Sequence, residues 1–217
     1  MIIKKFGLIG FHEAYALQER LAAGVAAGTE EETLLLLEHP PVFTIGSGGS
    51  EGNILDPSVA AVRISRGGDV TFHGPGQLVG YPIIDLARRS KDLHRYLRFL
   101  EELVIRIAAE FGVAALRISG KTGVWTVSPP VSAKLASIGV GVRRWVTMHG
   151  FALNVTTDLS RFSPINPCGI VACPVTSLFV ELGEVVSVDE IKERVALRFE
   201  MLLDDLLPVD FGDIIKT

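Results

Sequence analysis

The order of strand-like and helix-like segments is the feature that most restricts the fold of this chain. Apolar residues recur at helical spacing in residues 17–25, 93–111 and 187–202. Strand-like runs lie near residues 33–38, 42–46, 60–66, 77–85, 113–118, 123–127, 133–142 and 145–155. Only the helical segment 93–111 lies between these strand-like runs. The chain therefore lacks the strict alternation of strands and helices that a parallel sheet requires. The sequence therefore predicts an α/β (α+β) fold with a mixed, largely antiparallel sheet and flanking helices.

Length, composition and charge indicate the class of protein, a globular chain of one domain. A chain of 217 residues with 48% apolar residues can bury roughly 70% of its unfolded surface, so we expect one domain over residues 1–217. The net charge of −4 argues against nucleic acid as a partner. The apolar stretches are too short for a membrane span, and no signal-peptide pattern precedes them. A cytoplasmic protein that contacts no membrane is expected.

The run from Arg66 to Gln77 has the composition of a pocket wall. It contains four glycines and a proline within twelve residues. Glycine lets backbone amides approach a bound group closely, and proline stiffens the turn. An elaborate β-hairpin turn has the same composition. Since the run contains neither GxxxxGK[ST] nor GxGxxG, a P-loop or Rossmann nucleotide site is not indicated.

Two reactive side chains occupy unusual positions in the second half of the chain. Lys134 lies on a strand-like run of small and apolar residues, and Cys168 stands between a proline and a glycine. A thiol on such a bend can face a cleft. Cys173 is read as a buried small residue, with a redox partner for Cys168 as the alternative. Two cysteines do not suffice for a disulfide framework or a zinc site, so neither a metal nor a cofactor is predicted.

General chemistry favours His149 as the activator of the thiol. Cys–His pairs are the commoner arrangement, and histidine is the usual acid–base catalyst. By this reasoning Cys168 and His149 form the dyad. A lysine on a strand edge can also serve only to deter aggregation.

Four blocks of sequence resemble the octanoyltransferases of lipoate biosynthesis, the lipoyl(octanoyl) transferase family. They are residues 38–46, the run from Arg66, the segment 134–155 with KLASIG and HGFALN, and Asn166-Pro167-Cys168-Gly169. The resemblance covers residues 38–170. It implies the fold of biotin protein ligase and lipoate ligase catalytic domains.

The resemblance also implies a reaction, the first step of endogenous protein lipoylation. An octanoyl (medium-chain acyl) group would pass from octanoyl-acyl carrier protein to Cys168 as a thioester, and then to a lysine of lipoyl domains. The implied acceptors are the lipoyl domains of 2-oxoacid dehydrogenase complexes and the glycine cleavage H protein.

The same resemblance assigns the site residues and replaces His149 by Lys134 as the second catalytic residue beside Cys168. Lys134 would favour the thiolate as an ammonium or act as a base when neutral, and the sequence leaves both roles open. His149 becomes a possible supporting residue near the thioester, with a structural hydrogen bond as the alternative. The predicted substrate-binding residues are Arg66, Gly67, Gly68, Asp69, Val70, Thr71, Phe72, His73, Ser137, Ile138, Gly139, Gly150, Phe151 and Ala152.

Two other functions remain open. An ATP-dependent lipoate or biotin ligase of the same fold would not need Cys168 and would carry its own glycine-rich signatures, which are absent here. A non-catalytic binder of lipoyl domains would need neither Cys168 nor Lys134.

Docking of an acidic carrier protein calls for a basic rim. The available clusters are Arg88, Arg89 and Lys91, and Arg143 with Arg144. Ordinary solvated surface is the alternative interpretation of both clusters.

Overall fold

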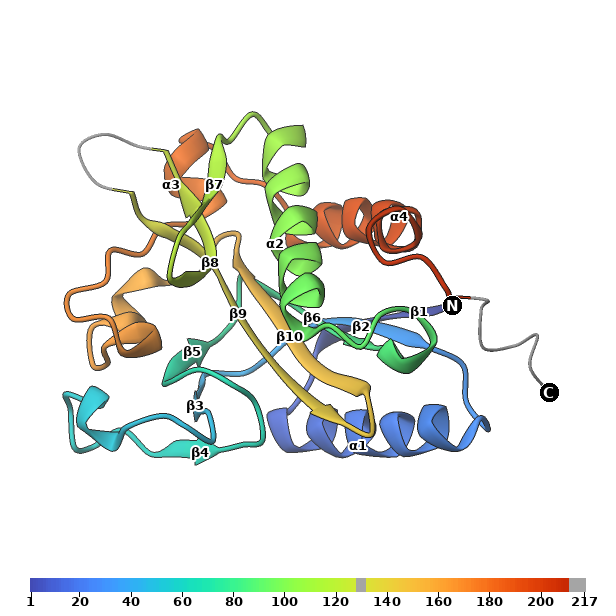
Figure 1. The fold of residues 1–217 in the computed structure, drawn as a ribbon. Helices are drawn as coiled ribbons and strands as arrows, with labels where there is room; N and C mark the ends of the chain where they lie inside the picture. The colour runs from blue at the N-terminus through green and yellow to red at the C-terminus, as the bar shows by residue number, and fades with distance from the viewer. Residues whose placement is uncertain (128–131, 211–217) are drawn as a thin grey trace.

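The computed structural model describes residues 1–127 and 132–210. Its centre is a seven-stranded sheet with the strand order β1-β2-β6-β10-β9-β8-β7 (Figure 1). Only β1 and β2 pair in parallel, while the other neighbours are antiparallel. This confirms the predicted fold class. The strands are β1 (Ile2–Leu8), β2 (Thr33–Glu38), β6 (Gln77–Ile83), β7 (Ala115–Ile118), β8 (Lys121–Thr126), β9 (Lys134–Arg143) and β10 (Val146–Asn154).

A second sheet of three short strands holds the glycine-rich run. Its order is β4-β3-β5, formed by Ala61–Arg63, Val42–Ile45 and Thr71–His73. The sequence did not predict β5, because three residues between glycine-rich turns are too few to show a period of two. The predicted strand over residues 60–66 is shorter in the structure, since the chain after Ile64 turns away toward β9 and Gly67 N donates to Val140 O at 2.8 Å.

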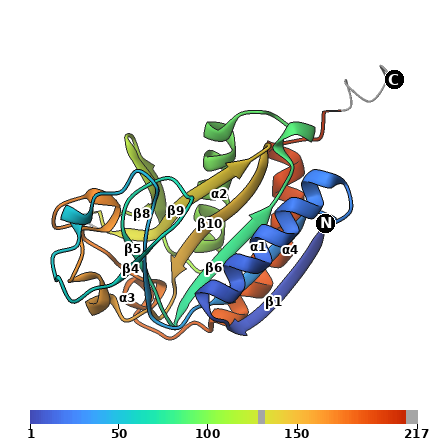
Figure 2. The ribbon, with the colours of Figure 1, turned by 90° about the horizontal axis from the view of Figure 1, so that it is seen from below.

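Helices cover both faces of the large sheet (Figures 1 and 2). One face packs against α1 (Phe11–Ala27), and the other packs against α2 (Leu93–Glu110) and α4 (Val188–Leu206). In β2, Leu34 and Leu36 face α2 and α4, whereas Leu35 and Leu37 face α1. A strand buried on both faces reads as a continuous apolar run, which explains the unbroken leucines.

The three helices predicted from apolar spacing are all present. Ser187 caps α4 by accepting a hydrogen bond from Asp189 N at 3.2 Å, in agreement with the start predicted from the capping pattern. The short helix α3 (Leu178–Leu182) was not predicted. No helix in residues 1–127 and 132–210 has the length and apolar character needed to cross a membrane.

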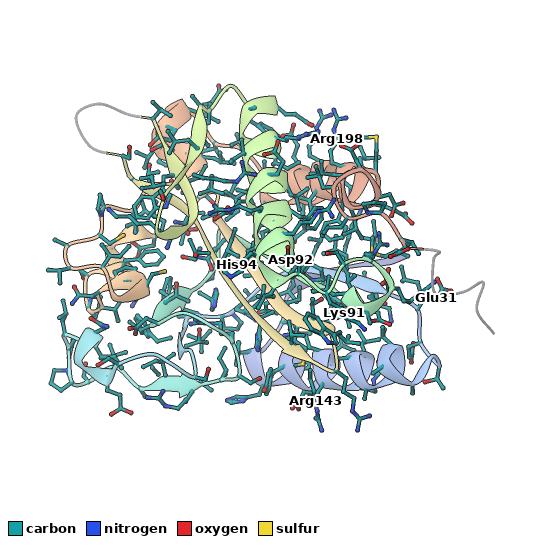
Figure 3. All side chains as sticks on the ribbon, viewed as in Figure 1. Glu31, Lys91, Asp92, His94, Arg143 and Arg198 are labelled. Atoms are coloured by element: carbon teal, nitrogen blue, oxygen red, sulfur yellow. The ribbon has the colours of Figure 1, made fainter. Side chains whose placement is uncertain are left out.

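The basic clusters differ in exposure. Arg89 is buried, with its side chain only 6% exposed, and pairs with Glu32 at 3.2 Å and Asp204 at 2.8 Å. It links the sheet to α4 and cannot belong to a docking rim. Lys91 is exposed, and Arg143 extends from the tip of the β9–β10 hairpin (Figure 3).

Candidate active site

A cavity follows the paired strands β9 and β10. Ser137 pairs with Ala152, Ile138 with Phe151 and Gly139 with Gly150, so the two predicted segments lie directly opposite each other. All six residues line a cavity with about 450 Å³ of empty space, part of it open to solvent. The other predicted residues that line it are Arg66, Gly68, Asp69, Thr71, His73, His149 and Cys168.

The strand period explains which predicted residues do not line the cavity. Asp69, Thr71 and His73 face it, whereas Val70 and Phe72 point the other way into a small core beside Ile45 and Phe162. Side chains of a strand alternate between its two faces. The glycine-rich run therefore contributes alternate residues to the cavity. Gly67, which bonds to β9 through its backbone, does not line it either.

Glycines in β9 let the chain before β5 lie against that strand. A Cβ atom on Gly139 would stand 3.1 Å from Gly67 O, and one on Gly141 would collide with Ser65 O. The contacts fix a direction: Ser65 lies beside Gly141, and Val70 O accepts a hydrogen bond from Cys168 N at 3.0 Å. The run thus extends from the hairpin end of β9 to the cysteine.

Cys168 has a left-handed backbone, with φ 58°, and Gly169 follows at φ 71°. For a residue other than glycine this conformation is uncommon and must be held by its surroundings. Here Asn166 N donates to Asn53 O at 2.7 Å, and Asn53 Nδ2 donates to Asp69 Oδ2 at 2.7 Å. The cysteine loop is thereby tied to the glycine-rich run through Asn53, a residue that the sequence did not single out.

The side chain of Lys134 meets this cysteine. Lys134 Nζ donates to Cys168 Sγ at 2.8 Å and lies 5.3 Å from the centroid of the Trp125 ring. The residue is 2% exposed, and no carboxylate of the described residues forms an ion pair with it. Its backbone is held by the chain after Cys168, since Lys134 N donates to Pro174 O at 2.7 Å.

Gly123 on β8 makes room for the lysine side chain. Its φ is +124°, and a Cβ atom there would lie 2.7 Å from Lys134 Cε and 2.6 Å from Ala136 O. Gly123 N donates to Glu101 Oε1 at 3.1 Å, and Glu101 belongs to α2. The sequence analysis missed Gly123 because its role depends on a residue eleven positions further along the chain.

The two cavity histidines are held neutral. Burial, with the charge of Arg66 as a smaller cause, lowers the pKa of His149 to about 4. Burial likewise lowers the pKa of His73 to about 3, and its Nδ1 lies 2.8 Å from Gln77 Oε1. Neither histidine is hydrogen-bonded to Cys168, whose side-chain partner among the described residues is Lys134.

Two buried polar atoms in the cavity wall have no hydrogen-bond partner among the described residues. They are Thr71 Oγ1 and His149 Nε2. Unpartnered buried polar groups are rare in folded proteins and call for an explanation. A bound group with its own polar atoms would satisfy them.

Cys173 has a different environment from Cys168. It is half-buried, burial raises the pKa of its thiol, and it does not line the cavity. It lines a separate depression with Asn166, Pro167 and Val171. A raised thiol pKa lowers the thiolate fraction and hence the reactivity of this cysteine.

The chain is similar in sequence to known proteins. Residues 11–200 match the family described as the lipoyl protein ligase A/B catalytic domain. The octanoyltransferase of Geotalea uraniireducens is 66% identical over 209 residues, which cover 96% of each chain. That of Geobacter metallireducens is 65% identical over 208 residues, again 96% of each chain.

Solved structures share the fold. A bipartite lipoate protein ligase studied with its E2 lipoyl domain, from Thermoplasma acidophilum, aligns with a TM-score of 0.66 and 18% identity over 93% of this chain and 83% of that one. Biotin protein ligase from Aquifex aeolicus, in complex with biotin and ATP, aligns with a TM-score of 0.56 and 13% identity over 98% and 75%. The expected likeness to lipoate and biotin ligases is confirmed for the fold.

Proposed function

Because the chain belongs to the lipoyl protein ligase A/B catalytic domain family, we propose that it moves an octanoyl group from acyl carrier protein to a lipoyl-domain lysine through a thioester on Cys168. Octanoyl transfer in protein lipoylation is its activity, and it is an acyltransferase. The observation that carries the proposal is the buried Lys134 Nζ at 2.8 Å from the Cys168 sulfur, in the wall of the cavity. Residues 1–217 act as one catalytic domain, in the cytoplasm.

The first half-reaction uses Lys134 as an ammonium. A buried cation is costly unless a counter-charge neutralises it, and the sulfur of Cys168 is the atom placed to do so. The thiolate attacks the carbonyl carbon of the octanoyl thioester, and an Sγ–C bond forms. The bond from that carbon to the carrier sulfur breaks, and the departing thiolate takes a proton from Lys134.

The second half-reaction restores both groups. Lys134, now neutral, accepts the proton that the lipoyl-domain amine loses when its nitrogen attacks the acyl-enzyme. A C–N bond forms, the Sγ–C bond breaks, and Cys168 leaves as the thiolate beside a recharged Lys134. Lysine suits this cycle because its amine can release a proton near neutral pH when buried, whereas a guanidinium cannot.

The cavity supplies binding energy and orientation. An octanoyl chain has about seven carbons beyond the carbonyl, and burial at ~0.8 kcal/mol per methylene gives roughly 5 kcal/mol. His73 and His149 are neutral and add no charge to the wall at pH 7. Thr71 Oγ1, buried without a partner among the described residues, is one side-chain donor available to the thioester oxygen.

The acceptors proposed are the lipoyl domains of 2-oxoacid dehydrogenase complexes and the glycine cleavage H protein. An adenylating ligase is the competing function, because chains of this fold include a biotin protein ligase solved with ATP. The reaction of an adenylating ligase does not require a thiol held in a strained loop against a buried lysine. That constellation favours the transferase.

Intact mass after incubation with octanoyl-acyl carrier protein, without nucleotide, tests the proposal. Wild type should gain one octanoyl group that hydroxylamine removes, and should pass it to a lipoyl domain. Cys173→Ala is the matched control and should be acylated like wild type, whereas Cys168→Ser should form no hydroxylamine-labile adduct. Labelling only at Cys173, or turnover only with free octanoate and ATP, would refute it.

A further inference from the structure

One aromatic side chain lies behind the cavity wall at His149, whose ring lines the cavity. Tyr15 of α1 stacks on the His149 ring, with centroids 5.5 Å apart and planes 17° from parallel. Its hydroxyl lies 3.1 Å from Ser65 Oγ. From these contacts we infer that Tyr15 holds the His149 ring as the end wall of the acyl cavity and so sets the longest acyl chain that the protein accepts. The inference rests on the proposed assignment of this cavity to the acyl chain.

A second hollow begins on the other side of Tyr15. It is lined by Tyr15 and Ser65, together with Ala22, Val142 and Met148, and has about 1140 Å³ of empty space that includes open solvent. Its lining residues alternate along the chain with those of the acyl cavity, since Ile64 and Arg66 line the cavity and Ser65 lines the hollow. Tyr15 lines the hollow and the His149 ring stacked on it lines the cavity, so the two rings stand between adjoining spaces.

The reactive end lies near Ala136 on β9. Gly123 marks the place, since a Cβ atom on it would lie 3.3 Å from Lys134 Nζ and 2.6 Å from Ala136 O. At the other end, Val140 pairs with His149. From Ala136 to Val140 the strand advances four residues, or about 13 Å at ~3.3 Å per residue.

The length of an octanoyl chain matches this interval. A carbon–carbon bond of ~1.5 Å at a tetrahedral angle advances about 1.25 Å, so seven bonds span roughly 9 Å. Within an interval of about 13 Å this leaves about 4 Å, the contact distance between a terminal methyl and the His149 ring. A dodecanoyl chain is about 5 Å longer by the same measure and would have to pass through the positions of the His149 and Tyr15 rings.

The position of this wall makes it testable without loss of the core. Tyr15 is only half-buried and Ser65 is exposed. Replacing Tyr15 by alanine removes the ring that holds His149 against the cavity and leaves the packed residues of α1, such as Ala14 and Leu21, in place.

Binding of free fatty acids tests the wall independently of acyl transfer. Isothermal calorimetry with octanoate, decanoate and dodecanoate should be run on wild type, Tyr15→Ala and Tyr15→Phe. Wild type should bind decanoate and dodecanoate no more tightly than octanoate. In Tyr15→Ala each added methylene should strengthen binding by about fourfold, so decanoate should bind roughly fifteenfold more tightly than octanoate. Tyr15→Phe keeps the stacked ring and should retain the wild-type limit.

The outcomes separate the two proposals. Equal chain-length profiles in wild type and a folded Tyr15→Ala would overturn the wall, even if Cys168 is acylated as proposed. An extended profile in Tyr15→Ala would support the wall, even if acylation of Cys168 failed. Tighter binding of dodecanoate than octanoate by wild type would also overturn the inference.

Discussion

Acidification should destabilise the fold through the neutral histidines of the cavity, and the share of His149 can be isolated by substitution. Burial lowers the pKa of His149 from its ordinary 6.5 to about 4. As the pH falls through 6.5, the unfolded chain takes up a proton at this residue and the folded chain does not. Stability that is fully present above pH 6.5 is therefore lost progressively between pH 6.5 and about pH 4.

The magnitude follows from the two pKa values. A pH of 5.0 lies 1.5 units below the ordinary pKa of 6.5, so His149 is protonated in the unfolded chain, whereas in the folded chain it is still mainly neutral. At ~1.36 kcal/mol per unit, His149 lowers the free energy of unfolding by about 2 kcal/mol between pH 7.5 and pH 5.0.

Urea unfolding at pH 7.5 and 5.0 measures this contribution of His149 to the free energy of unfolding. Asparagine is the suitable replacement at His149, because it tolerates the backbone φ of 59° found there. The difference in unfolding free energy between the two pH values should be about 2 kcal/mol smaller in His149→Asn than in wild type. His94→Asn, on the exposed first turn of α2 (Figure 3), is the control and should keep the wild-type difference. Identical pH dependence in His149→Asn and wild type would refute the lowered pKa of His149.

Three further substitutions probe the site. Lys134→Met should slow acyl transfer by roughly 10²–10⁴-fold and should also slow alkylation of Cys168 by iodoacetamide at pH 7. Lys134→Arg should rescue transfer only in part. Normal rates of both reactions in Lys134→Met would reduce the lysine to a structural role. Gly123→Ala should lower the free energy of unfolding by about 1–3 kcal/mol through its backbone strain and should also reduce transfer by displacing the lysine. Gly120→Ala, at φ +76° with open space around its Cβ position, carries strain alone, so an equal loss of transfer in both variants would contradict this role. Asn53→Ala should slow formation of the acyl-enzyme, because the cysteine loop loses its link to the glycine-rich run; the rate of adduct formation in the folded variant is the measurement, and a wild-type rate would argue against a positioning role.

Much of the fold was determined by local patterns. The helices α1, α2 and α4 follow from apolar residues at a spacing of 3.6, and the long strands β2, β6, β9 and β10 follow from apolar and β-branched runs. Such patterns arise because each element must bury one or both faces. Elements too short to carry a period, such as β5 and α3, could not be predicted in this way.

The chemistry of the site was determined only in part by the sequence. The residues themselves favoured a Cys168–His149 dyad, and the resemblance to a family pointed to Lys134 instead. Sequence motifs also indicated which segments line the cavity, but they could not say which residues within each segment do so. Alternation along β5 decided that, and it turned Val70 and Phe72 away from the cavity.

Contacts between distant segments were decided by the tertiary structure alone. Lys134 and Cys168 are 34 residues apart, and their meeting requires the pairing of Lys134 with the chain near Val175 and the space left by Gly123. Tyr15 reaches Ser65 across 50 residues because α1 packs on the sheet beside β10. Local sequence carries the preference of a segment for helix or strand, whereas the identity of its neighbours depends on how all the faces pack at once.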